Sequence, residues 1–274
     1  MKQVLIAVDG SDWSQVAAHY ALEFVRGSQR EVVALGVLPP EVIQSLGESP
    51  ETLAFSPQVP EGEQMGRRTL KDWFDQAESL CAEAGVCFAR TVDSGQAAER
   101  LEWASLTSYL VALGAHGAHG THIPPNGQGL GHTALHMVRN SLKPMLITRR
   151  EYRPIKRVLL GWDMHPQAGH AAEMILAPAQ RQGWEIVIAS GAQPTSPMAQ
   201  TCNRLAEAFG EEGVAAEAYV TPGNSPAIIF DAIAKFQPDL LVIGGHRRTT
   251  RGLLSEGSWL EILEQVTIPT LLYR

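Results

Sequence analysis

Residues 3–9, QVLIAVD, and residues 157–163, RVLLGWD, are two copies of one apolar run that ends in an aspartate. Continuous apolar runs of this length are typical of strands covered on both faces in a parallel sheet. In the first copy, 22 positions separate Asp9 from Glu31, where the next apolar run begins, and in the second copy 22 positions separate Asp163 from Glu185. The equal spacing predicts an internal repeat.

The repeat continues to the end of each half. SYLVALGAHG at 108–117 parallels DLLVIGGHRR at 239–248, and KPMLITR at 143–149 parallels IPTLLYR at 268–274. The halves differ mainly by an insertion around residues 38–64, whose Pro, Ser and Glu content indicates a long loop after a strand. We therefore predict two homologous domains, at residues 1–150 and 155–274, with a boundary near residue 153.

Helical patterns lie between the apolar runs. Residues 11–27 carry apolar side chains at helical spacing, with Ser11 or Asp12 as the expected N-cap and Gly27 at the end. Residues 225–236 are expected to form a helix with Ser225 as its N-cap and a proline in the first turn. Alternating strands and helices imply right-handed crossovers, so the predicted fold class is α/β, with a doubly wound parallel sheet in each domain.

Composition excludes several classes of protein. The chain has 274 residues, of which 45% are hydrophobic and 19% charged, so it can bury a core. Its net charge of -7 argues against a general binder of nucleic acids or anionic membranes. Its three cysteines show no metal-binding spacing, and no apolar span reaches 18 residues. We expect a cytoplasmic protein with no membrane and no nucleic acid among its partners.

The carboxyl ends of the strands are where ligands bind in such sheets. Asp9 and Asp163 each end the first strand of a half, where a carboxylate can accept a hydrogen from a base or a sugar. Glycines follow the fourth strand, and they allow main-chain N–H groups to approach phosphate oxygens at a helix N-terminus. This edge is therefore the predicted ligand site in both halves.

The glycine spacing in the second half resembles that of the universal stress protein family, whose ATP-binding members carry G-x2-G-x9-G-[ST] at this place. Gly244, Gly257 and Ser258 match this motif, but Arg247 replaces the middle glycine. Its charge can offset phosphate repulsion, while its side chain can also fill the groove.

The first half departs from the motif in its loop length. Gly114 and Gly117 are intact, but the third glycine is Gly131, after thirteen intervening residues, and His132 stands in the hydroxyl position. Alternatively, Gly127 keeps the nine-residue spacing, with glutamine in the hydroxyl position. The longer loop displaces N–H groups that must converge on phosphate, so we predict that the second half is the better nucleotide site.

The resemblance implies two tandem domains, each with five strands in the order 3-2-1-4-5, that pack through their last strands as a pseudo-dimeric monomer or a homodimer. It also implies a stress-response sensor or regulator that binds ATP or ADP, with Mg²⁺, and that can have protein partners. The implied binding residues are Asp9, Val37, Gly114, Gly117 and Gly131 in the first half and Asp163, Gly244, Arg247, Gly257 and Ser258 in the second.

Two alternatives stay open. In one, the clefts are vestigial and the protein is an interaction module without nucleotide. In the other, zinc binds the histidine-rich loop at 116–136, because two histidines four residues apart share one helix face. The residues for that site would be His116, His119, His132 and His136. No Walker-type lysine, G-x-S-x-G or HExxH motif occurs, so we assign no catalytic residue and expect any ATP hydrolysis to be slow.

Overall fold

A computed structural model describes residues 3–38, 64–118, 123–124, 127–245 and 256–274. The chain divides into two compact units, and each is described by itself. The first unit comprises Met1–Ile123 and Leu130–Tyr152, and the second comprises Pro124–Gly129 and Arg153–Arg274. Nearly all of the insertion after the second strand lies outside the described residues.

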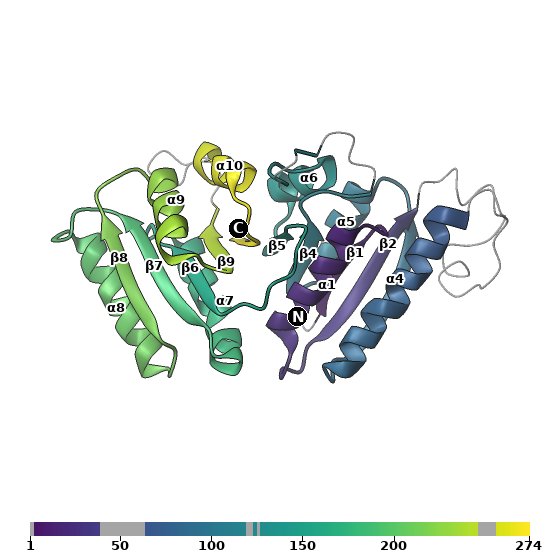
Figure 1. The fold of residues 1–274 in the computed structure, drawn as a ribbon, viewed down its shortest axis with the longest axis horizontal. Helices are drawn as coiled ribbons and strands as arrows, with labels where there is room; N and C mark the ends of the chain where they lie inside the picture. The colour runs from purple at the N-terminus through teal and green to yellow at the C-terminus, as the bar shows by residue number, and fades with distance from the viewer. Residues whose placement is uncertain (1–2, 39–63, 119–122, 125–126, 246–255) are drawn as a thin grey trace. The chain divides into compact units, whose positions relative to one another are not determined.

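The first unit is built on parallel strands in the order β3-β2-β1-β4-β5. This is the predicted order, and it confirms the fold class for this unit. β4 and β5 are buried along almost their whole length, as their continuous apolar sequences predicted. The strands are β1 (Gln3–Val8), β2 (Glu31–Leu38), β3 (Phe88–Ser94), β4 (Leu110–Gly114) and β5 (Met145–Thr148) (Figure 1).

Helices connect these strands, and the direction of each crossover fixes the face that each helix covers. The chain moves from β1 to β2 to β3 through the first two helices and returns to β4 and β5 through the last two. Right-handed crossovers in opposite directions place the two pairs on opposite faces of the sheet. The helices are α1 (Asp12–Val25) and α4 (Gln64–Glu83) on one face and α5 (Ala97–Ser105) and α6 (His132–Asn140) on the other.

The second unit repeats this arrangement, with its strands in the order β8-β7-β6-β9-β10. The strands are β6 (Arg157–Gly161), β7 (Glu185–Gly191), β8 (Ala216–Thr221), β9 (Leu240–Gly244) and β10 (Thr270–Tyr273). By the same crossover argument, one face carries α7 (Pro166–Gln182) and α8 (Pro197–Glu211), and the other carries α9 (Ser225–Phe236) and α10 (Glu256–Gln265). The fold class is confirmed for this unit too.

Capping residues explain where the helices begin. Of the two N-cap candidates for α1, the structure selects Ser11 over Asp12, and the Ser11 side chain accepts a hydrogen bond from the N–H of Ser14. The prediction for α9 was wrong by one residue, because Asn224 is the N-cap and Ser225 is already helical. The Asn224 side chain accepts from the N–H of Ala227, 3.1 Å away. Both residue types cap helices well, so sequence preference alone does not separate them.

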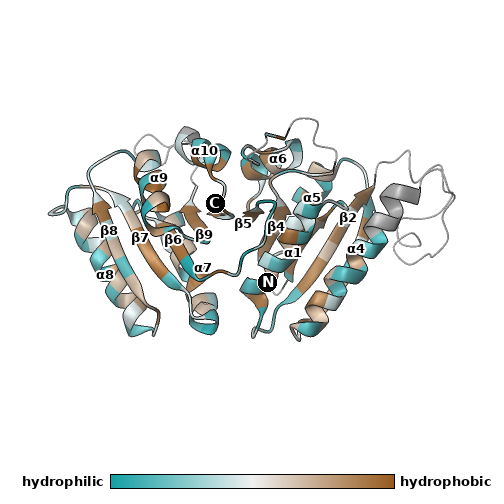
Figure 2. Ribbon diagram, in the orientation of Figure 1, coloured by the Kyte–Doolittle hydropathy of each residue, from teal (hydrophilic) through white to brown (hydrophobic). Residues whose placement is uncertain are grey.

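The hydropathy pattern locates the core of each unit. Figure 2 shows β2 and β7 as largely apolar, while α8 and the coloured part of α4 carry many hydrophilic residues. Trp184, just before β7, and Trp259 in α10 are among the largest fully buried side chains. No helix in the described part of the chain has both the length and the apolar character needed to cross a membrane.

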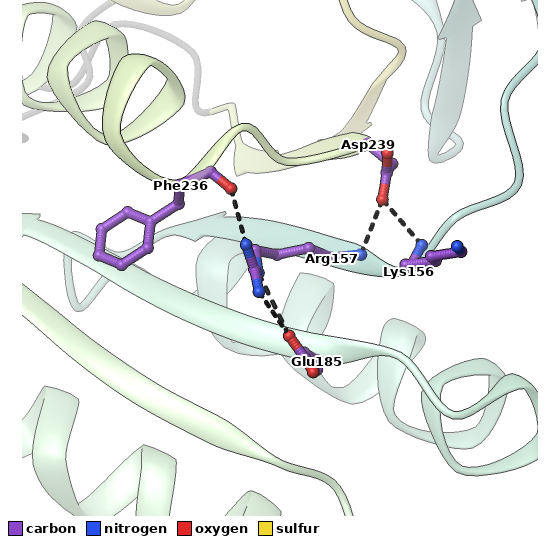
Figure 3. Close-up of polar contacts among 5 residues, drawn as sticks. All are labelled: Lys156, Arg157, Glu185, Phe236 and Asp239. Carbon is purple, nitrogen blue, oxygen red and sulfur yellow. Dashed lines mark hydrogen bonds and ion pairs between the residues drawn. The ribbon is translucent and has the colours of Figure 1, made fainter.

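The amino edge of the second sheet is held by a polar network (Figure 3). One carboxylate oxygen of Asp239, just before β9, accepts the N–H groups of Lys156 and Arg157, each at 2.9 Å. The Arg157 guanidinium donates to Glu185 and to the carbonyl of Phe236, at 2.9 and 3.0 Å. These bonds join the starts of β6, β7 and β9 and the end of α9, so they fix the sheet at the edge opposite the predicted ligand site.

The segment after β5 is anchored to α1 by an aromatic and acidic cluster. The Tyr152 hydroxyl donates to Glu23 at 2.5 Å, and its ring stacks on His19 with centroids 4.8 Å apart. Burial lowers the pKa of His19, while the nearby Glu23 opposes that shift. Burial and the bond to Glu23 together raise the pKa of Tyr152. The last residue of the first unit is therefore held on its first helix.

Candidate functional site

At the carboxyl edge of the first sheet, Asp9 has both carboxylate oxygens engaged by its own chain. Oδ1 accepts the N–H of Ser11 at 3.0 Å and its hydroxyl at 2.6 Å. Oδ2 accepts the N–H of Ala118, from the loop after β4, at 2.8 Å. The carboxylate thus ties the start of α1 to the glycine loop, and it has fewer lone pairs left for a ligand.

The two leading glycines of this loop are required by packing. A Cβ placed on Gly114 would lie 2.6 Å from Cβ of Trp13 and 2.7 Å from the carbonyl oxygen of His116. A Cβ placed on Gly117 would lie 2.6 Å from Oδ2 of Asp9. We predicted that these glycines serve close approach to phosphate, which stays a prediction; in this unit each one also allows close packing of another part of the protein.

An aromatic pair fills the space beside the loop. Trp13 and His116 are 6% and 7% exposed, and their rings meet edge to face with centroids 4.9 Å apart. Gly131, the N-cap of α6, donates its N–H to the carbonyl of Ala115 at 2.7 Å and so ties the start of α6 to the residue before His116. Two buried rings therefore pack beside the carboxyl edge of the first sheet.

The remaining predicted residues of the first half lie at the same edge of the sheet. Val8 pairs with Gly36, so Asp9 and Val37 are the next residues along two neighbouring strands. Gly131, rather than Gly127, directly precedes α6. Gly127 groups with the second unit, and the neighbouring Gln128 side chain donates to the carbonyl of Gln265 at 2.6 Å.

The histidines proposed as zinc ligands have separate environments. His116 packs against Trp13, and His136 Nε2 contacts Oε2 of Glu102 in α5 at 2.8 Å. His132 is exposed at the start of α6, while His119 lies outside the described residues. Among the residues that the structure describes, no three His, Cys, Asp or Glu side chains gather as a metal-binding group.

The second unit presents its aspartate differently. Asp163 is 6% exposed, and its Oδ1 accepts the N–H of His165 at 3.0 Å. Its Oδ2 is buried and has no hydrogen-bond partner within the described ranges. A buried acceptor left unpaired costs about 1–3 kcal/mol, more if it is charged. Asp163 is therefore suited to accept a hydrogen from a bound ligand.

The glycine at the end of β9 has the same packing role as its counterpart in the first unit. A Cβ on Gly244 would lie 2.5 Å from the backbone nitrogen of Ala168, in the first turn of α7. Gly257 is in the first turn of α10, and Ser258, which follows it, is half-buried. Arg247 lies outside the described residues. The described part of the predicted site is thus the turn after β6, the end of β9 and the start of α10.

Met164 is a feature of this edge that sequence reasoning missed. Its φ is 61°, in the left-handed region, and its side chain is 52% exposed. Gly10 occupies the corresponding position of the first unit with a φ of 82°. A side chain other than glycine in this region costs roughly 1 kcal/mol. The signal available in the sequence was the change from glycine to methionine right after the repeated aspartate.

Solved structures share this architecture over the whole chain. A universal stress protein from Archaeoglobus fulgidus DSM 4304 is 15% identical with a TM-score of 0.68, and the match covers 100% of this chain and 98% of that one. A protein from Pseudomonas aeruginosa UCBPP-PA14 is 12% identical with a TM-score of 0.66, covering 100% and 93%. At these identities the likeness shows the fold.

The family comparison rests on the sequence. The pattern that defines the universal stress protein family matches residues 1–149, which is more than half of the chain. No curated protein matches this chain. The matched residues hold the whole order of strands of the first unit, and the second unit repeats that order. The chain therefore belongs to the universal stress protein family.

Proposed function

We propose that this protein binds an adenine nucleotide, ATP or ADP, at the carboxyl edge of its second unit and acts as a nucleotide-dependent sensor or regulator in a stress response. The observation that carries the proposal is the buried Oδ2 of Asp163, which lacks a partner in the described part of the chain. An adenine amino group or a ribose hydroxyl supplies the hydrogen that this oxygen lacks.

The elements around Asp163 suit the rest of a nucleotide. The backbone after Gly244 and the N-terminus of α10, with Gly257 and Ser258, are expected to face the phosphates. A helix N-terminus favours negative charge, and its unpaired N–H groups can donate to phosphate oxygens. The guanidinium of Arg247 would supply a positive charge to this loop, and Mg²⁺ would enter with the phosphates.

The first unit supports a different role. Its Asp9 is engaged by Ser11 and Ala118, and Trp13 and His116 fill the adjoining space. A nucleotide would have to displace these internal contacts before it could bind. We therefore propose that the first half keeps the fold as an interaction module for a protein partner, with no nucleotide at its edge.

Isothermal titration calorimetry with Mg²⁺–ATP on the full chain tests this proposal. We expect one nucleotide per chain, and a loss of affinity of at least about tenfold in Asp163→Ala, because a hydrogen bond to a charged group is lost. Asp9→Ala is the matched control, since it removes the equivalent aspartate of the repeat, and its affinity should equal that of the unaltered protein. No binding by the unaltered protein, or equal losses in both variants, would contradict the proposal.

A further inference from the structure

We infer that Met164 contacts the base of the nucleotide in the second unit and helps to determine which ligand binds there. This inference rests on the proposed function and adds a residue whose role the aspartate and glycine positions do not suggest. It starts from one comparison. Both units make the same tight turn after their first strand, but only the second unit places a side chain at its centre.

The turn itself does not require methionine. In the first unit the N–H of Ser11 donates to Oδ1 of Asp9 at 3.0 Å, and in the second the N–H of His165 donates to Oδ1 of Asp163 at 3.0 Å. The residue between them has a positive φ in each case, 82° for Gly10 and 61° for Met164. Glycine adopts this conformation without steric penalty, whereas methionine does not.

Burial of the side chain does not explain the methionine either. Met164 is 52% exposed, although the residue before it, Asp163, is 6% exposed. Met164 is thus a large apolar side chain that is exposed to solvent in a disfavoured backbone conformation. It lies next to a buried oxygen that has no partner in the described residues. We expect this combination at the edge of a binding site, where a ligand contacts both groups. A glycine at this position would form the turn with less strain. The strained methionine is therefore explained by a role of its side chain and not by the turn.

The chemistry of the two side chains defines the ligand. The carboxylate of Asp163 needs an N–H or O–H donor. The thioether of Met164 offers a soft, polarizable, apolar contact that suits the face or edge of an aromatic ring. A purine nucleoside carries both features close together, whereas a bare polyphosphate carries neither. Met164 therefore belongs at the base end of the site, away from the phosphates.

The chain contains a matched control for backbone strain. Gln237 also has a positive φ, 48°, at the C-cap of α9, where its N–H donates to the carbonyl of Ile233. It lies just before β9, at the amino edge of the sheet, while Met164 lies just after β6, at the carboxyl edge. Replacing either residue by glycine relieves the same kind of strain, but only one of them lies beside Asp163.

Calorimetric titration of the full chain with Mg²⁺–ATP tests the inference through Met164→Gly, Met164→Ala and Gln237→Gly. We expect both Met164 variants to bind ATP about tenfold more weakly, since both lose the thioether contact. Gln237→Gly should bind like the unaltered protein. The melting temperature should rise in both glycine variants, which shows that they are folded and less strained.

The possible outcomes separate the two claims. If the unaltered protein does not bind ATP, the proposed function fails and this inference fails with it. If the unaltered protein binds and both Met164 variants bind equally well, only the inference is overturned. It is also overturned if Met164→Gly weakens binding while Met164→Ala does not, because the effect would then come from backbone freedom and not from the side chain.

Discussion

The carboxyl edges of the two units descend from one repeated pattern, yet they treat the same aspartate in opposite ways. One carboxylate oxygen of Asp9 accepts a hydrogen bond from Ser11, and the other accepts one from the loop N–H of Ala118. One carboxylate oxygen of Asp163 accepts a hydrogen bond from the N–H of His165, and the other is buried without a partner in the described ranges. The difference teaches that a repeated motif can be completed by internal contacts in one copy and, within the described residues, left incomplete in the other.

Neighbouring residues account for this difference. In the first unit the packed rings of Trp13 and His116 support the loop that reaches Asp9. At the position of Trp13 the second unit has Gln167, which brings no ring to this edge. The first unit also makes its turn with Gly10, whereas the second uses the strained Met164. One edge is therefore stabilised by contacts within the first unit, and the other holds a strained methionine and a buried oxygen that lacks a partner in the described residues.

The largest expected effect concerns what the two edges share. Gly244→Ala and Gly114→Ala should each destabilise their unit by about 3 kcal/mol, because the new methyl group meets neighbouring atoms at 2.5 and 2.6 Å. Urea denaturation followed by tryptophan fluorescence measures this. Gly169→Ala in α7 is the control, since no atom lies within 4 Å of its Cβ position. It should raise stability by roughly 0.5–1 kcal/mol, and equal losses at all three positions would contradict the packing role.

The next effect separates the two aspartates in the absence of nucleotide. Asp9→Ala should destabilise the first unit by about 2 kcal/mol, because it removes the partner of two N–H groups and one hydroxyl. Asp163→Ala should cost less, or even stabilise the second unit, because it also removes a buried oxygen that lacks a partner in the described residues. Urea denaturation measures both, with native-state hydrogen exchange to assign each change to a unit. A larger loss of stability in Asp163→Ala than in Asp9→Ala would contradict the expected difference between the two edges.

A smaller effect tests the loop contact of the first unit. Gly117→Ala places a methyl group 2.6 Å from Oδ2 of Asp9, so the loop must shift and the bond from Ala118 weakens. We expect a loss of about 1 kcal/mol and faster hydrogen exchange at the Ala118 amide. Gly131→Ala serves as the control for hydrogen exchange at the Ala118 amide, since its nearest neighbour would be 3.4 Å away, and its own loss of stability comes from replacing the glycine N-cap of α6. Unchanged protection of Ala118 in Gly117→Ala would show that this contact does not hold the loop.

The smallest effect concerns pH and should be confined to the first unit. Burial lowers the pKa of His19 below its value in the unfolded chain, so the unfolded state binds more protons between those two pKa values. Stability contributed by neutral His19 is therefore present near pH 7 and lost as the pH falls through about 6.5 and below.

Urea denaturation at pH 7.5 and pH 5.5 checks this sign. His19→Gln should reduce the loss of stability between the two pH values, because glutamine does not titrate. The corresponding residue of α7 is the exposed Glu173, so Glu173→Gln is the matched control and should leave the pH dependence of the first unit unchanged. A steeper dependence in His19→Gln would contradict the direction of the shift.

The sequence alone determined the architecture. The apolar runs of β1 and β6, the equal spacing from Asp9 and Asp163 to the next strands, and the N-cap at Ser11 all predicted what the structure contains. These features are local, since the burial of a strand on both faces and the capping of a helix leave their mark on adjacent residues. The choice of Asn224 over Ser225 as an N-cap needed the backbone conformation.

Only the tertiary structure decided how the two edges differ. Asp9 and Asp163 are equivalent in the sequence, but the N–H that pairs with Oδ2 of Asp9 comes from a residue 109 positions away along the chain. The glycines of the loop are likewise equivalent in a motif, but Gly114 faces Trp13 and Gly117 faces Asp9. Hydrogen-bond saturation and close contact are properties of groups brought together from distant parts of the chain, so they appear only when the chain is folded.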